Sequence, residues 1–184
     1  MRKFALATVL AMAAVSASAV EVRLEGQDAD GKNGTASQTV YEASVKQAIN
    51  KNFAGDLTVK QYRTDGTHAL ANRVEAGVTA SNTYGNFTPY TRVALGEKYA
   101  SGSSGYGYYS VEPGVAVAVF PAVTASLGYR FQNAFNDSHD DLTRTWRAKV
   151  GYDLTKADTV YVGFDRQRGD SEQNTTKVGY IHRF

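Results

Sequence analysis

Apolar and polar residues alternate along most of this chain. In the opening segment 20–27, VEVRLEGQ, valine and leucine alternate with glutamate and arginine. Because successive side chains of a β-strand point to opposite faces, this period of two predicts strands. Ten such segments are found, at 20–27, 39–49, 57–64, 70–80, 87–98, 108–119, 123–133, 142–153, 159–167 and 175–184. We predict an all-β protein of about ten strands, or of eight or twelve if a weak strand is misjudged.

The connections between these segments alternate between two kinds. NKNFAG, SNTYGN, FPA and LTKAD are tight turns, whereas DADGKNGTAS, DGTHA, ASGSSGYG, AFNDSHDD and RGDSEQN are polar and mostly longer. Short turns at one end and longer polar loops at the other are typical of an antiparallel up-and-down β-barrel in an outer membrane. An even number of strands places both termini at the periplasmic end.

The polar face of the strands carries seven acidic and eleven basic residues. Such a face would suit the outside of a soluble sandwich as well as the water-filled or ion-paired interior of a membrane barrel. In the barrel interpretation, the residues that line the interior and set its selectivity are Arg23, Glu42, Lys46, Lys60, Arg73, Glu75, Arg92, Glu112, Arg130, Arg147 and Lys149. Glu21, Glu25, Lys98, Asp153, Asp165, Lys177 and Arg183 complete the set. The excess of bases favours anions weakly.

The apolar face favours the membrane barrel. Its aromatic residues fall near the two predicted interfaces, as expected in a bilayer: Tyr84, Phe87, Phe120, Tyr152 and Phe184 at the turn end, and Tyr41, Tyr129, Phe131, Trp146 and Phe164 toward the loops. Strand direction places the three arginines of this face, Arg63, Arg144 and Arg166, at the outer rim. We expect them to bind lipopolysaccharide phosphates or, alternatively, to be solvated.

The N-terminus predicts export. Arg2 and Lys3 precede an apolar stretch and the small-residue site Ala17-Ser18-Ala19, so residues 1–19 are predicted to be a signal peptide and residues 20–184 the barrel. Removing Arg2 and Lys3 leaves as many acidic as basic residues, which gives no indication of a nucleic-acid partner. The sequence contains no cysteine, so disulfides and thiol chemistry are excluded.

The C-terminus resembles the Gram-negative outer-membrane β-barrel superfamily. In that superfamily a last strand ending in phenylalanine is recognised by the barrel-assembly machinery, and Tyr180 and Phe184 match this signal. The last hairpin is similar to that of general diffusion porins in a set of matching residues: Tyr152, Leu154, Lys156, Thr159, Tyr161, Val178, Gly179, His182 and Phe184. General diffusion porins have about sixteen strands and a long pore loop. The size of this chain is closer to small monomeric porin-like barrels, including acidic-oligosaccharide porins.

Enzyme chemistry is not indicated. SHDD at 138–141 resembles part of an omptin protease site, but the second carboxylate pair is missing, and a polar turn is the simpler interpretation. His68, His139 and His182 lack metal-ligand spacing, so no metal or cofactor is expected. RGD at 168–170 occurs in a predicted loop, where Gly-Asp is ordinary turn chemistry.

Two functions remain open from the sequence. The first is a small outer-membrane channel for ions or small polar solutes, with anions preferred, acting as a monomer or small homo-oligomer. The second is a closed structural or adhesive barrel, plugged by ion pairs such as Glu42–Lys46, Arg73–Glu75 and Glu112–Arg130.

Overall fold

The described part of the chain consists of strands joined by turns and loops. A computed structural model describes residues 20–67, 69–100, 105–136, 139 and 141–184. The predicted signal peptide, 1–19, lies outside the described residues. Among the residues described, no helix is long and apolar enough to cross a membrane. The strands are β1 (Val20–Lys32), β2 (Gln38–Ala48), β3 (Phe53–Thr64), β4 (Leu70–Ser81), β5 (Phe87–Ala100), β6 (Tyr106–Phe120), β7 (Val123–Ala134), β8 (Thr143–Asp153), β9 (Asp158–Gly169) and β10 (Glu172–Arg183).

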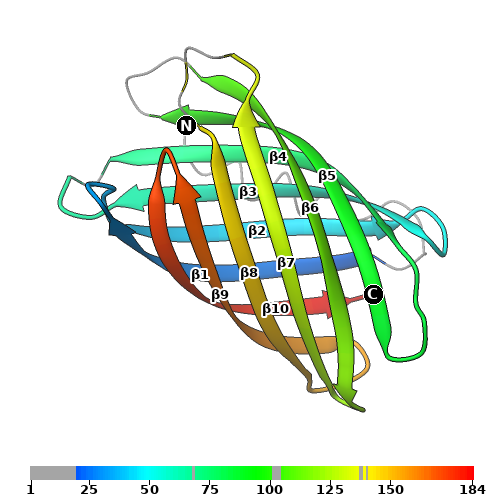
Figure 1. Cartoon of the computed structure of the whole chain (residues 1–184). Helices are drawn as coiled ribbons and strands as arrows, with labels where there is room; N and C mark the ends of the chain where they lie inside the picture. The colour runs from blue at the N-terminus through cyan, green and yellow to red at the C-terminus, as the bar shows by residue number, and fades with distance from the viewer. Residues whose placement is uncertain (1–19, 68, 101–104, 137–138, 140) are drawn as a thin grey trace.

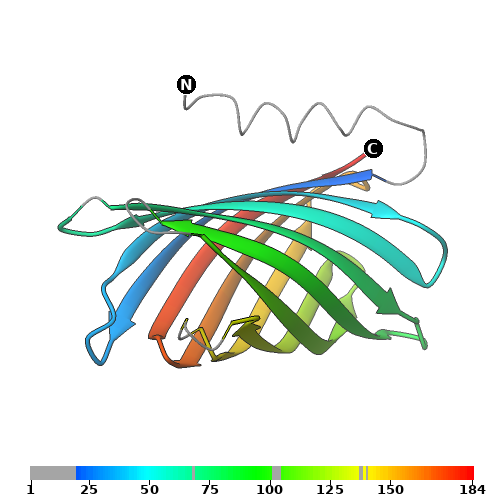
Figure 2. The ribbon, with the colours of Figure 1, turned by 90° about the horizontal axis from the view of Figure 1, so that it is seen from above.

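The ten strands form one closed antiparallel barrel. Each strand pairs with its neighbours in sequence, and β10 pairs with β1 to close the sheet, so that Glu21 lies opposite Arg183 and Lys32 opposite Glu172. Figure 1 shows the strands crossing the molecule at a steep tilt, and Figure 2 shows the sheet curving round on itself. Closure satisfies the backbone groups of every strand edge, as a membrane requires. The predicted ten-strand up-and-down barrel is confirmed.

The strands are longer than the alternation predicted. β1 continues through the polar residues 28–32, and a two-residue turn at Asn33 and Gly34 joins it to the chain before β2. Both residues have positive φ, of 51° and 85°, and the Thr35 N–H donates to the Lys32 carbonyl oxygen at 2.9 Å. This is the geometry of a tight hairpin turn, which Asn-Gly adopts readily. The predicted ten-residue loop at 28–37 is therefore wrong: its first half extends the β1 ladder.

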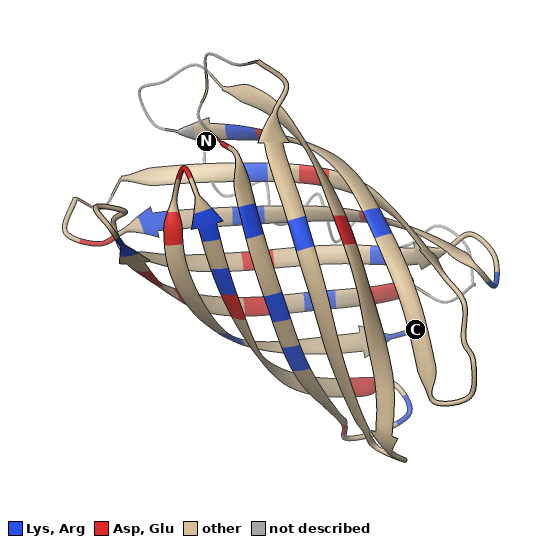
Figure 3. Cartoon of the chain, viewed as in Figure 1, with Lys and Arg blue, Asp and Glu red and all other residues tan. Residues whose placement is uncertain are grey.

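The two faces of the sheet differ in polarity. Apolar side chains such as Val93, Leu95 and Val162 point outward, each half or more exposed. The alternate residues point inward and are mainly charged or hydroxylated, and Figure 3 shows Lys, Arg, Asp and Glu at intervals along the strands. The pairing register of β6 and β7 shifts between Ala118 and Phe120, next to the turn that joins these strands. Because the shift lies at the end of the ladder, it does not change which side chains face inward along the rest of the two strands.

Inward glycines make room for large tyrosines. A Cβ atom at Gly96 would overlap the Tyr108 ring, and one at Gly179 would overlap the Tyr161 ring. Both tyrosines lie over the glycine of the neighbouring strand and reach carboxylates in the interior: the Tyr108 hydroxyl donates to Glu75 at 2.8 Å. A side chain at Gly96 would displace Tyr108 and this hydrogen bond.

The polarity of the outer face predicts a depth-dependent cost of charge. Replacing Val93, in the middle of β5, by arginine is expected to lower the free energy of unfolding by about 2–4 kcal/mol in lipid vesicles, whereas Asn72→Arg near the loops should cost about 0–1 kcal/mol. Urea unfolding of both variants in the same vesicles measures this difference. Equal effects would show that the outer face does not cross a bilayer at this depth.

Candidate functional site: the charged interior

The interior contains two polar cavities. We call the end that carries Val20, Phe184 and the connections after β2, β4, β6 and β8 the turn end, and the opposite end the loop end. The turn-end cavity has a volume of about 300 Å³ and the loop-end cavity of about 50 Å³. Ten of the eleven interior residues predicted from the sequence line the turn-end cavity, and Arg73 lines the loop-end cavity. The predicted inward phase of these residues agrees with the structure, while their role in selectivity stays a prediction.

Three basic residues stand between the cavities. Lys60 on β3, Arg130 on β7 and Arg147 on β8 each line both cavities. We call them the three-base constriction. Lys60 and Arg130 are buried, and the Arg147 side chain is 20% exposed. Arg130 and Arg147 come from the adjacent strands β7 and β8, and Lys60 comes from β3, farther round the barrel.

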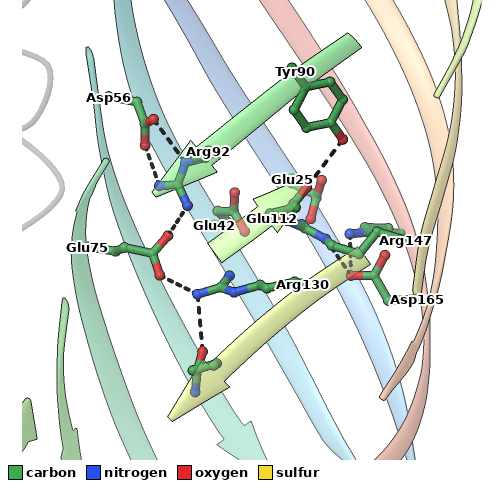
Figure 4. A network of polar contacts seen from close by, with 12 residues as sticks. Glu25, Glu42, Asp56, Glu75, Tyr90, Arg92, Glu112, Arg130, Arg147 and Asp165 are labelled. Carbon is green, nitrogen blue, oxygen red and sulfur yellow. Dashed lines mark hydrogen bonds and ion pairs between the residues drawn. The ribbon is translucent and has the colours of Figure 1, made fainter. Parts of the chain in front are cut away.

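Glu75 is the centre of one group of ion pairs. Its carboxylate accepts from Arg92 Nη1 at 2.6 Å and from Arg130 Nη2 (Figure 4). It also accepts from the Tyr108 hydroxyl. Arg92 also binds Asp56, with its Nε 3.0 Å from Oδ1 and its Nη2 2.5 Å from Oδ2. Arg92 thus bridges β3 and β4 and holds two carboxylates at once, as the guanidinium fork allows.

Arg147 is the centre of a second group. Its Nη1 donates to Glu112 at 2.6 Å and its Nε to Asp165 at 3.2 Å (Figure 4). Lys177 donates to the same Asp165 oxygen at 2.6 Å. The strand register explains this proximity, because Arg147 lies directly opposite Asp165 in the β8–β9 ladder.

A third group surrounds Glu42 and Glu25, which lie directly opposite each other in the β1–β2 ladder. Two like charges in these positions would repel. Glu42 is neutralised by Arg23 and by Lys60, the latter at 2.5 Å. Glu25 accepts a hydrogen bond from the Tyr161 hydroxyl at 2.5 Å, and Gln27 Nε2 donates to both carboxylates.

The ion pairs are not those predicted from the sequence. Glu42, Glu75 and Glu112 each bind a base, but the bases are Arg23 and Lys60, then Arg92 and Arg130, then Arg147. The prediction chose partners close in the sequence or on adjacent strands. In the structure some partners are on adjacent strands, as Lys60 is directly opposite Glu42, whereas Arg130 of β7 reaches across the interior to Glu75 of β4.

Two interior acids were missed. Asp56 belongs to β3, in the same phase as Thr58 and Lys60, but it falls between NKNFAG, the turn predicted at 50–55, and the segment predicted to begin at Leu57. Asp141 follows a polar loop, and it accepts from Gln132 Nε2 at 2.6 Å and lies 3.8 Å from Lys98 Nζ. With them the interior holds nine acids against eleven bases, so the surplus of positive charge is smaller than predicted. The alternation running back from Lys60 to Asp56 was the signal that could have revealed the first.

Three interior bases have no acidic partner among the described residues. Lys46 makes no ion pair there, Lys149 lies over the Tyr161 ring at 5.0 Å, and Arg73 lies over Tyr108 at 4.8 Å. Arg73 also donates to Gln132 at 3.1 Å. Lys46 and Lys149 line the turn-end cavity and Arg73 the loop-end cavity. Each cavity thus contains at least one base that forms no ion pair with a described residue.

The outward-facing predicted residues lie where the strand phases place them. Arg144 on β8 and Arg166 on β9 are exposed on adjacent strands, and Arg63 on β3 is exposed on the opposite side of the barrel. Tyr180 and Phe184 are also exposed. Binding of lipopolysaccharide by the arginines and recognition of Tyr180 and Phe184 during assembly stay predictions.

The histidine and acidic motifs form no metal cluster in the described part of the chain. Ser138, Asp140 and His68 lie outside the described residues, and His139 stacks on Tyr106 with ring centroids 4.5 Å apart. The RGD triplet is not a free loop, because Arg168 and Gly169 end β9 and the Asp170 carboxylate accepts from the Leu142 N–H at 2.6 Å. His182 Nδ1 lies 2.8 Å from Asp158.

Comparison with known proteins identifies the fold. No protein-family profile matches the sequence, and no curated protein matches it. Among solved structures, an outer-membrane channel from Pseudomonas putida F1 is similar with a TM-score of 0.61, 9% identity and coverage of 93% of this chain and 97% of that one. The β domain of the Bordetella autotransporter BrkA has a TM-score of 0.52, 12% identity and coverage of 90% and 99%. The NanC porin has a TM-score of 0.51, 12% identity and coverage of 90% and 100%.

The chain therefore has the fold of an outer-membrane β-barrel, and the resemblance predicted from its C-terminus is confirmed at that level. The similar structures comprise a channel, a porin and an autotransporter domain. At such low identity the likeness defines the fold, so the function has to be argued from the interior.

The network predicts that Glu75 is important for stability. In the Glu75→Ala variant, Arg92 retains its ion pair with Asp56, but Arg130 loses its ion pair and retains only its hydrogen bond to Gln132. An uncompensated buried charge should lower the free energy of unfolding by about 3–5 kcal/mol. Urea unfolding measures this loss, with Glu97→Ala, an exposed outward position on β5, as the matched control at about 0.5 kcal/mol or less. Equal values for the two variants would contradict a structural role for the network.

Proposed function

We propose that this protein is a narrow outer-membrane channel for small anions. The observation that carries the proposal is the arrangement of interior charge: two polar cavities share the three-base constriction in their walls, and each cavity has a base that forms no ion pair with a described residue. Rings of basic side chains favour anions in pores because they replace part of the hydration shell with fixed positive charge.

The lining and the volumes of the two cavities favour small solutes. Hydroxyl groups of serine and threonine make up much of the turn-end wall, including Ser44, Thr58, Thr79 and Ser126. They supply hydrogen bonds for a hydrated ion without adding charge. The loop-end cavity, at about 50 Å³, leaves room for a few water molecules or a small ion. Inorganic anions and small carboxylates are therefore the proposed solutes.

The outer face supports the location. An apolar surface with aromatic side chains toward both ends suits a bilayer, and the fold is that of outer-membrane proteins. We propose that the barrel is inserted there as a monomer or small homo-oligomer, with its turn end toward the periplasm.

A second candidate is a closed structural barrel. The observation that favours it is that each base of the constriction binds an acid: Lys60 binds Glu42, Arg130 binds Glu75, and Arg147 binds Glu112 and Asp165. Such pairs, if they never open, would plug the interior. Conduction distinguishes the two candidates.

The channel proposal predicts charge selectivity controlled by the unpaired lysines. In planar bilayers under a salt gradient, the protein should show discrete openings with a reversal potential of the sign expected for anions. Lys46→Glu/Lys149→Glu should shift that potential toward cation selectivity. Lys156→Glu, an exposed residue of the β8–β9 turn that lines neither interior cavity, is the control and should leave the potential almost unchanged. A folded barrel that never conducts would support the closed barrel instead.

A further inference from the structure

An arginine cluster occupies the outer face at the loop end of β8 and β9. Arg144 lies directly opposite Arg168 in the β8–β9 ladder, and Trp146 lies opposite Arg166. Arg144, Arg166 and Arg168 are all exposed. Directly opposite side chains on one face are about 4.5–5.5 Å apart at Cβ, and diagonal ones are within reach of long side chains. The three guanidinium groups can therefore converge on one ligand.

The positive charge of this cluster is not compensated within the described chain. None of its three arginines forms an ion pair with a described residue. The two acids that follow β9 bind neutral donors: Asp170 accepts from the Leu142 N–H, and Glu172, the first residue of β10, accepts from Asn33 Nδ2 at 2.6 Å. Like charges placed directly opposite each other destabilise a sheet. An anion bound from outside the chain would offset this repulsion.

Neighbouring aromatic residues fix the depth of the cluster. Trp146 packs edge-on against Tyr129, with ring centroids 4.9 Å apart, and Phe131 lies opposite Arg144 in the β7–β8 ladder. Tryptophan and tyrosine mark the membrane interface, where their apolar rings and polar atoms are both accommodated. Arg144 and Arg168 lie one step beyond Trp146 and Arg166 toward the loops, which is the level of lipid headgroups.

We propose that the β8–β9 arginine cluster binds the phosphates of lipopolysaccharide. The headgroup of its lipid A is a bisphosphorylated sugar, which presents several phosphate oxygens on one rigid frame. Guanidinium groups bind phosphate with paired hydrogen bonds, and Asn174, opposite Arg166 in the β9–β10 ladder, adds an amide donor. The loop end faces the outer leaflet in the orientation proposed above, and that leaflet contains lipopolysaccharide.

The structure refines the prediction made from the sequence. Arg63, on β3, lies four strands from β9 and five from β8 round the barrel and does not belong to the cluster. Arg168 does belong, although RGD had been assigned to a loop. The proposal depends on the outer-membrane location but not on conduction, so the failure of one does not decide the other.

The test uses the sole tryptophan of the sequence, Trp146, as a reporter. The refolded barrel in zwitterionic detergent micelles is titrated with bisphosphorylated lipid A while Trp146 emission is followed, and native mass spectrometry counts bound lipid A independently. Arg144→Gln/Arg168→Gln should weaken binding about tenfold or more, since charge-assisted contacts to phosphate are lost. Lys51→Gln/Lys156→Gln, which removes the same charge from the turn end, should bind as the unmodified protein does. Retained near-native β-sheet circular dichroism shows that each variant is folded.

Three results would overturn the proposal. The first is no lipid A retained by the unmodified protein in either measurement. The second is equal binding by Arg144→Gln/Arg168→Gln and the unmodified protein. The third is binding of phosphatidylglycerol as tight as that of lipid A, which would make the cluster a general contact for anionic headgroups. Binding that is lost with the dephosphorylated lipid would support it.

Discussion

The structure depends on the requirement that every charge turned into the barrel find an opposite charge, a hydrogen bond or water. An isolated ion in a dry interior is costly, and breaking one partner of a buried pair costs several kcal/mol. The chain meets this requirement by crosslinking its strands: Arg92, Arg130 and Arg147 each bind acceptors on more than one strand. The same contacts hold side chains in the lumen and so determine how much of it stays open.

The interior bases that form no ion pair give the interior its proposed function. Most interior acids form ion pairs. In contrast, Lys149 and Arg73 lie over tyrosine rings, Arg73 also donates to an amide oxygen, and Lys46 lines the turn-end cavity. An interior built only for stability would gain nothing from leaving these bases without acids. In the account proposed here, water and small anions supply the missing charge.

Much of the fold was predictable from the sequence, because alternation, turn chemistry and closure all follow from local rules. The phase of the strands was enough to place Arg23, Glu75 and Lys149 inside and Tyr180 outside. The partners that meet across the interior were not predictable, because Arg130 and Glu75 are 55 residues apart and come together only after the sheet has closed. Asp56 and Arg168 were misassigned because turn-like residues extend the ladder rather than end it.

The central claim is that the interior passes small anions through the three-base constriction. Chloride influx into proteoliposomes, reported by an entrapped halide-sensitive dye, tests it most directly. The account predicts that influx rises in proportion to the amount of folded barrel per vesicle and exceeds the influx of a cation of similar size. Folded, inserted barrel with influx no faster than that of empty vesicles would contradict it.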